Sequence, residues 1–163
     1  MMENYKDLFE ETSKMKKDVL LTVKGKHKER GADWEGLEVM TTGTLYEKNG
    51  SLYLIYDEVM GEDDSDVSHN RIKIEQDPLM VTMTKSGAVV SVMSFGKDVK
   101  EKSSYATPYG SFILGVDTRE ICFENREDYM KLQIRYDLEM NYEPFSESDI
   151  CIEAKSCQPV PEQ

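Results

Sequence analysis

Tyrosine, phenylalanine and methionine are the residues of this sequence with the clearest potential for binding chemistry. A tyrosine hydroxyl can orient a ligand, and methionine thioethers form adaptable apolar walls. The set comprises Tyr56, Phe95, Tyr105, Tyr109, Phe112 and Tyr136, together with Met83, Met93, Met130 and Met140. We predict that a small, largely apolar ligand is contacted by Tyr56, Tyr105, Tyr109, Tyr136 and Arg71.

Signatures of catalysis are missing from the sequence. It contains no G-x-S-x-G nucleophile motif, no P-loop and no glycine-rich dinucleotide turn. Asp137 or Glu58 could act as the general base of a hydrolase, but the sequence positions no partner for either. Cys122 and Cys151 fall in apolar segments, where cysteine usually behaves as a small buried hydrophobe. We therefore predict no catalytic residue and no cofactor, and rank an enzyme below a binding protein.

Metal binding is also not predicted. An acidic loop could offer oxygen ligands to a hard cation such as Ca²⁺, but its spacing is not that of an EF-hand; its residues are Glu58, Glu62, Asp63, Asp64 and Asp66. Such charge runs are usually solvated turns. The two histidines, His27 and His69, form no i, i+4 pair and have no neighbouring cysteine at zinc spacing.

These side chains must be positioned by strands, because alternation of apolar and polar residues is the dominant pattern from Asp18 onward. Tyr129 to Met140 alternates most regularly, and Asn49-Gly50 predicts a tight hairpin. Thr107-Pro108-Tyr109-Gly110 predicts a sharp corner between two strands, since proline fixes its own φ and glycine accepts a positive one. Gly96 to Ser104 is interpreted as a polar connection, and Ala88 to Phe95 as a strand covered on both faces. Glu143-Pro144 is interpreted as a second corner before a last strand from Asp149 to Lys155.

Many short strands joined by tight turns indicate a single all-β domain, an antiparallel β-barrel in which closure removes exposed strand edges. We predict a short N-terminal helical arm over 1–17, the barrel over 18–155 and a disordered tail over 156–163. Two states of the barrel remain open. Its interior could hold a ligand, or it could be filled by its own side chains, as eight strands enclose just enough space for them.

Several short motifs resemble those of the YwiB-like family, a group of bacterial proteins of unknown function. They are Gly43 with Tyr46, Leu52 to Glu58, Gly87, Met93-Ser94-Phe95, Tyr105 to Gly110, Thr118 and Tyr136-Asp137-Leu138. The resemblance implies a calycin-type, lipocalin-like β-barrel and a cytoplasmic bacterial setting, with no established activity. Where the family tends to have arginine before the turn glycine, this chain has Lys85, which lacks the planar fork of a bidentate anion clamp.

The charge and cysteine content of the sequence limit the classes of partner that we expect for the protein. A net charge of −12 disfavours nucleic acids and anionic membranes, both of which bind through clusters of lysine and arginine. Three cysteines without a C-x-x-C pair, and no apolar N-terminal segment, favour a reducing cytoplasm. The alternative to a small-molecule ligand is a protein-interaction module, for example a homodimer, formed through the apolar run from Ala88 to Phe95.

Overall fold

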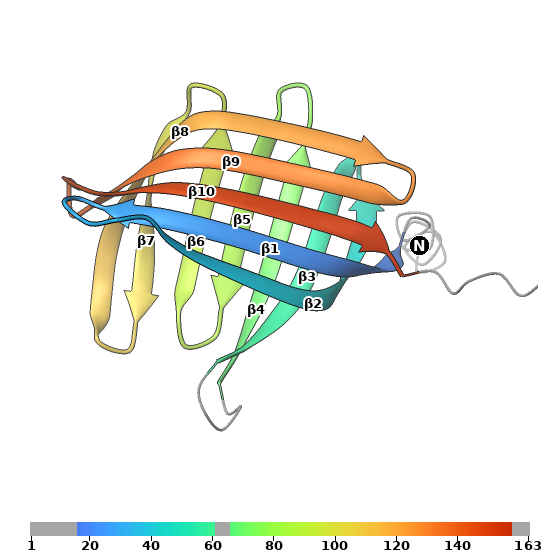
Figure 1. Ribbon diagram of the computed structural model, residues 1–163, viewed down its shortest axis with the longest axis horizontal. Coiled ribbons are helices and arrows are strands. Elements are labelled where there is room, and N and C mark those ends of the chain that lie inside the picture. The colour runs from blue at the N-terminus through green and yellow to red at the C-terminus, as the bar shows by residue number, and fades with distance from the viewer. Residues whose placement is uncertain (1–15, 61–65, 158–163) are drawn as a thin grey trace, which may run out of the picture.

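The structure of the protein, a computed structural model, describes residues 16–60 and 66–157, which form ten β-strands (Figure 1). The strands are β1 Lys17–Glu29, β2 Glu35–Lys48, β3 Ser51–Met60, β4 Asp66–Glu75, β5 Met80–Ser86, β6 Val90–Gly96, β7 Lys100–Thr107, β8 Gly110–Arg126, β9 Tyr129–Met140 and β10 Glu143–Ser156. Residues 1–15 of the predicted helical arm and 158–163 of the predicted tail lie outside the described residues. No helix within the described ranges has the length and apolarity needed to cross a bilayer.

The strands close into one barrel in the order β1-β10-β9-β8-β7-β6-β5-β4-β3-β2, and all neighbours are antiparallel. The prediction of an all-β antiparallel barrel is confirmed. In Figure 1, β1, β2 and β8 to β10 cross in front of β3 to β7, as in barrels built from two steeply crossed layers. The barrel has ten strands, so it is wider than the eight-stranded barrel on which the filled-interior alternative depends.

Alternation along β9 shows why the chain folds in this way. Met130, Leu132 and Ile134 are at most 1% exposed, whereas Gln133 between them and Arg135 after them face solvent. Moving each apolar side chain of this size out of water contributes about 1.5–3 kcal/mol. A shift of register by one residue would expose the whole set, so the alternation fixes which face of the strand is buried.

The core consists of side chains that point inward from both layers and are less than about a tenth exposed. They are Val19, Leu21, Leu45, Leu52, Leu54, Ile72, Ile74, Val81, Phe95, Val116, Met130, Leu132, Ile134, Ile152 and Ala154. Phe95, the largest of them, packs against the ring of Tyr136 with centroids 4.8 Å apart and planes inclined by 59°. This tilted arrangement suits the ring quadrupoles and joins the two layers.

The predicted Asn49-Gly50 hairpin and the predicted corner at Thr107 to Gly110 are both present. Asn49 and Gly50 have φ values of 52° and 81°, the left-handed conformations that a two-residue hairpin of this kind requires. The corner between β7 and β8 is closed through Thr107, whose Oγ1 accepts a hydrogen bond from the Tyr109 amide at 3.1 Å and donates one to the Gly110 carbonyl at 3.0 Å. Gly110 has a φ of 143°, which a residue with a Cβ would rarely adopt.

Three segments differ from the sequence interpretation. β7 begins at Lys100, inside the stretch interpreted as a polar connection, and β4 begins at Asp66, inside the predicted acidic loop. β10 begins at Glu143, where a second corner was expected before a shorter strand from Asp149. Each of these strand portions carries polar side chains on its inner face, so the apolar alternation that identifies a strand in sequence is absent there.

The strand formed by Ala88 to Phe95 was expected to be covered on both faces, and this expectation is wrong. β6 turns Ser91 and Phe95 inward, but Val90 and Val92 on its outer face are 47% and 43% exposed. The apolar run therefore reflects one buried face and one apolar outer face, rather than a strand enclosed between layers.

Candidate functional site

The inner wall of β3 to β7 changes from apolar to polar along the barrel. Residues opposite each other in antiparallel strands face the same side of the sheet, so the pairing assigns inward side chains to successive rows across the wall. Two rows are apolar: Leu52, Ile74, Val81 and Phe95, then Leu54, Ile72, Met83 and Met93. The next row, here called the polar row, consists of Tyr56, Asn70, Lys85, Ser91 and Tyr105.

A group of hydrogen-bonding side chains connects the polar row to Glu58, which lies one inward position further along β3. Asn70, 8% exposed, donates from Nδ2 to Glu58 Oε1 at 2.9 Å, and the Lys85 ammonium lies 3.7 Å from the same oxygen. Burial, with a smaller contribution from the Glu58 charge, raises the pKa of Tyr56 to about 12. Like an unperturbed tyrosine, Tyr56 is a neutral hydroxyl at physiological pH, able to donate a hydrogen bond, and the raised pKa extends this state to more alkaline pH.

The polar row lies at the end of the barrel where solvent reaches the inner wall; this end is here called the mouth. Side chains of the first apolar row are almost fully buried, but Met83 and Met93 in the second are only half-buried, as are Tyr56 and Tyr105. On β2 the pairing with β1 places Leu37 on the same inner face, where it is 71% exposed. Inward side chains of the first apolar row are thus almost fully buried, and several of those towards the mouth are partly exposed.

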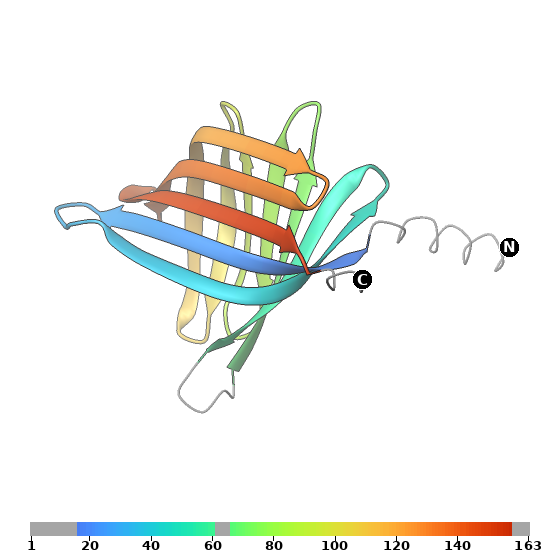
Figure 2. The same cartoon turned by 45° about the vertical axis from the view of Figure 1, so that its right-hand side comes forward.

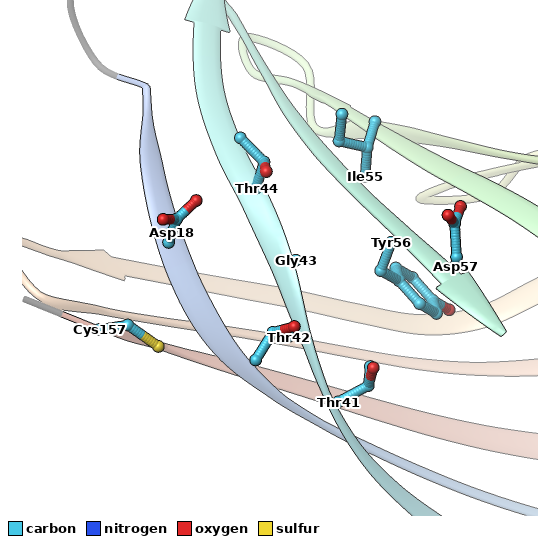
Figure 3. A pocket seen from close by; sticks show the side chains of 9 residues that line it. All are labelled: Asp18, Thr41, Thr42, Gly43, Thr44, Ile55, Tyr56, Asp57 and Cys157. Carbon is cyan, nitrogen blue, oxygen red and sulfur yellow. The ribbon is translucent and has the colours of Figure 1, made fainter.

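The wall also opens sideways between β2 and β3. Their ladder runs from Lys48–Ser51 only to Thr44–Ile55, and beyond these residues β2 follows β1 while β3 follows β4. Figure 2 shows the two strands running apart from their shared hairpin. A cavity of about 640 Å³ lies where they separate, lined by Asp18, Thr41, Thr42, Gly43, Thr44, Ile55, Tyr56, Asp57 and Cys157 (Figure 3).

Gly43 marks the point at which the strands separate. A Cβ at this position would lie 2.7 Å from the Ile55 carbonyl oxygen and 2.8 Å from Leu21 Cδ1. Only glycine allows β2 to pass this close to β3 and to the core. The same close approach brings Tyr56, which belongs to the polar row, to the edge of the cavity.

The structure brings three of the five predicted contact residues to the inner wall. Tyr56 and Tyr105 belong to the polar row, and Tyr136 faces inward from β9, where burial raises its pKa against the opposing effect of a hydrogen bond to Ser148. Arg71 is on the outer face, with its guanidinium 6.0 Å from the centroid of the Tyr53 ring. Tyr109 is 97% exposed at the tip of the β7–β8 turn, so it lies on the rim and does not reach the wall.

A second, charged cavity of about 560 Å³ lies on the outer wall, where two β-bulges face it. One bulge between Thr118 and Glu120 projects Arg119, and the other between Pro144 and Ser146 projects Phe145. The Arg119 Nε donates to Asp137 Oδ2 at 2.6 Å, and Asp117 approaches the same guanidinium at 4.0 Å. Asp137, considered above as a general base, is therefore engaged in an ion pair.

The remaining reactive groups of the described residues do not converge on a catalytic arrangement. His69 Nδ1 lies 2.7 Å from Asp57 Oδ1, and both side chains are mostly exposed. Cys122 faces solvent from β8, so the expectation that it is buried is wrong, whereas Cys151 is half-buried and burial raises its pKa. No group of three histidine, cysteine or acidic residues capable of holding a metal ion occurs in these ranges, and residues 61–65 of the acidic loop lie outside them.

Comparison with known proteins establishes the family. Residues 21–152 match the family model of DUF1934, described as a domain of unknown function. The chain belongs to this family. Its fold is similar to that of the YwiB protein from Bacillus subtilis, whose crystal structure superposes with a TM-score of 0.79 at 22% sequence identity. The match covers 92% of this chain and 99% of that one, and at this identity it shows a shared fold. Among curated proteins no match was found.

Sequence reasoning identified the tyrosines and considered Lys85 only as a poor substitute for an anion-clamping arginine, and it missed Asn70 and Ser91; Asn70, Lys85 and Ser91 are the other members of the polar row. Each occupies an inward position where an apolar residue would be expected, and it therefore interrupts the alternation of its strand. That interruption was the available signal. It marks a polar position in each strand separately, and only the register between strands shows that the positions form one row.

Proposed function

We propose that this DUF1934 domain binds a small, largely apolar molecule at the mouth of the barrel. The observation that carries the proposal is the change on the inner wall from apolar rows to the polar row. A ligand with an apolar body and a polar end would place its body against Met83 and Met93. Its polar end would meet the hydroxyls of Tyr56 and Tyr105.

Several features support this use of the barrel over a completely filled interior. Ten strands enclose more space than eight, and four inward side chains towards the mouth, Tyr56, Met83, Met93 and Tyr105, are only half-buried. The separation of β2 from β3 provides a lateral approach that does not require any ladder to open. In this proposal the barrel binds its ligand as a lipocalin does, and Tyr136 contacts the ligand from the opposite layer. A cytoplasmic setting is part of it, supported by three free cysteines.

The test uses N-phenyl-1-naphthylamine, an uncharged probe that fluoresces in apolar surroundings, after native mass spectrometry has checked for a copurified ligand. Met93→Gln replaces an inner-wall thioether by a polar side chain of similar length, and we expect it to weaken probe binding several-fold. Val92→Gln is the matched control on the outer face of the same strand. Absence of probe binding, or equal weakening by both substitutions, would refute the proposal.

A second candidate is an interaction module, and the exposed outer face of β6 favours it. Val90 and Val92 are 47% and 43% exposed beside each other on that face. In a homodimer this face would be covered, and Val92→Lys would shift the protein to monomers. Multi-angle light scattering across a range of concentrations measures this, and a monomer throughout, for the unmodified protein, would exclude the dimer.

A further inference from the structure

Lys85 occupies the centre of the polar row, and the structure fixes its place there. Its cross-strand partners are Asn70 on one side and Ser91 on the other. The turn that follows β5 lies close against β4, since a Cβ on Gly87 would stand 2.7 Å from the Val67 carbonyl oxygen. Gly87 also has a φ of 137°, which favours glycine at this position. The strand end that carries Lys85 therefore packs closely against β4, and the strand pairing places the Lys85 side chain in the inward-facing polar row.

The ammonium of Lys85 is incompletely neutralised by its neighbours. Among the described residues its ion-pair contact is with Glu58 Oε1, at 3.7 Å, which is beyond hydrogen-bonding distance. That oxygen already accepts a shorter hydrogen bond from Asn70 at 2.9 Å. The side chain of Lys85 is 31% exposed, so a ligand in the mouth can reach it.

The surroundings of Lys85 are rich in donors. Tyr56, Ser91 and Tyr105 contribute hydroxyls to the row. Among the residues whose side chains the structure describes, Glu58 is the acidic side chain paired with Lys85. Several donors and one loosely paired cation, at the end of an apolar wall, form a site that suits an acceptor with negative charge.

We propose that the polar end of the ligand is a carboxylate and that Lys85 binds it, while Glu58 weakens the interaction by competing for the same ammonium. This inference rests on the proposed ligand-binding function and assigns the chemistry of the ligand's polar end. A lysine contributes a point charge rather than a planar fork, so one ammonium–carboxylate contact, assisted by tyrosine hydroxyls, carries the recognition.

The experiment compares two displacers of bound N-phenyl-1-naphthylamine that share a ten-carbon chain, decanoate and decan-1-ol. Lys85→Met removes the charge and keeps most of the length, and we expect it to weaken decanoate about tenfold relative to decanol. Lys85→Arg should retain most of the preference for decanoate. Glu58→Gln removes the competing charge, and decanoate should then bind several-fold more tightly, with decanol unchanged.

Lys73→Met is a closely matched control. Lys73 lies on β4, its side chain is 35% exposed, and its ammonium stands 3.7 Å from Glu75, but it belongs to the outer face. The substitution Lys73→Met therefore makes the same change in net charge as Lys85→Met without altering the inner wall. We expect it to leave the ratio of the two displacement constants as in the unmodified protein.

The outcomes separate the two proposals. If the probe does not bind, or if neither compound displaces it, the proposed ligand-binding function is refuted. If both compounds displace the probe but Lys85→Met leaves their ratio unchanged, or changes it no more than Lys73→Met does, the carboxylate assignment is overturned while ligand binding stands. Opposite effects of Lys85→Met and Glu58→Gln on decanoate would support the assignment, since general damage to the fold cannot tighten binding.

Discussion

Replacing Gly43 by alanine tests whether the separation of β2 from β3 depends on a missing side chain. The new Cβ would lie 2.7 Å from the Ile55 carbonyl oxygen, 2.8 Å from Leu21 Cδ1 and 3.2 Å from Tyr56 Cβ. The carbonyl belongs to a strand backbone, and the Leu21 side chain is 0% exposed within the core, so neither group can move without a cost in free energy. The backbone of β2 or β3 must shift.

The size of the effect follows from what overpacking costs in other cores. Extra methyl groups in packed positions usually lower the free energy of unfolding by about 1–3 kcal/mol. For a protein of this length each kcal/mol lowers the melting temperature by about 2–4 °C, so a loss of about 2 kcal/mol corresponds to a fall of about 4–8 °C. Urea titration followed by circular dichroism gives the free energy, and a thermal scan gives the temperature.

Gly25→Ala is the matched control, because Gly25 lies in the adjacent strand β1 and a Cβ there would meet nothing within 4 Å. We expect this substitution to leave the stability unchanged or to raise it by up to about 1 kcal/mol, through reduced entropy of the unfolded chain. Equal unfolding midpoints for the two variants would refute the reasoning. They would show that β2 and β3 can move apart at this point without cost.

Three further predictions concern the core and the reactive groups. Burial and a nearby carboxylate raise the pKa of Tyr56 from 10.0 to about 12, so its contribution to stability is complete below pH 10 and is lost as the pH rises through 12. The unmodified protein should lose about 2–3 kcal/mol more than Tyr56→Phe over that interval, measured by urea titration, and parallel losses would contradict this. Phe95→Ala should lower the free energy of unfolding by about 3–5 kcal/mol, whereas a loss below about 1 kcal/mol would mean that the core is loosely packed there. At pH 8 a thiol reagent should modify the exposed Cys122 and Cys157 quickly and Cys151 slowly, because burial raises the pKa of Cys151; three equal rates would contradict the placement of β8 and β10.

Sequence predicted the parts of the fold in which local pattern and burial agree. β9 alternates from end to end and packs one face on the core, so its period alone defines it. The first part of β7, from Lys100 to Ser104, was missed because its inward side chain Ser103 is polar, while its outward positions include Lys100 and Lys102. A strand at an open end buries little, so selection for apolar residues at alternate positions is weak there.

The candidate site was predicted less well than the fold, because it is defined by register between strands. Tyr56 and Lys85 are far apart in sequence, and they share a row only through the successive pairings with Asn70. Arg71 was likewise predicted to contact the ligand from the inner wall. It pairs with Ile55 and Thr84, so its side chain lies on the outer face. One sequence does not define the number of residues by which neighbouring strands are offset.

Because the β2–β3 ladder ends early, backbone amides on the two sides of the barrel should exchange at very different rates. On the side of β2 that faces β3, amides from 35 to 43 have no partner strand among the described residues, whereas β9 is bonded along both of its edges. Amide protons on that free edge should exchange with deuterated water at nearly the rate of an unstructured peptide. Those of β9 should exchange only when the whole domain unfolds. The β2–β3 edge would then open locally while the rest of the domain stays folded, and a molecule entering there would not depend on an unfolding event.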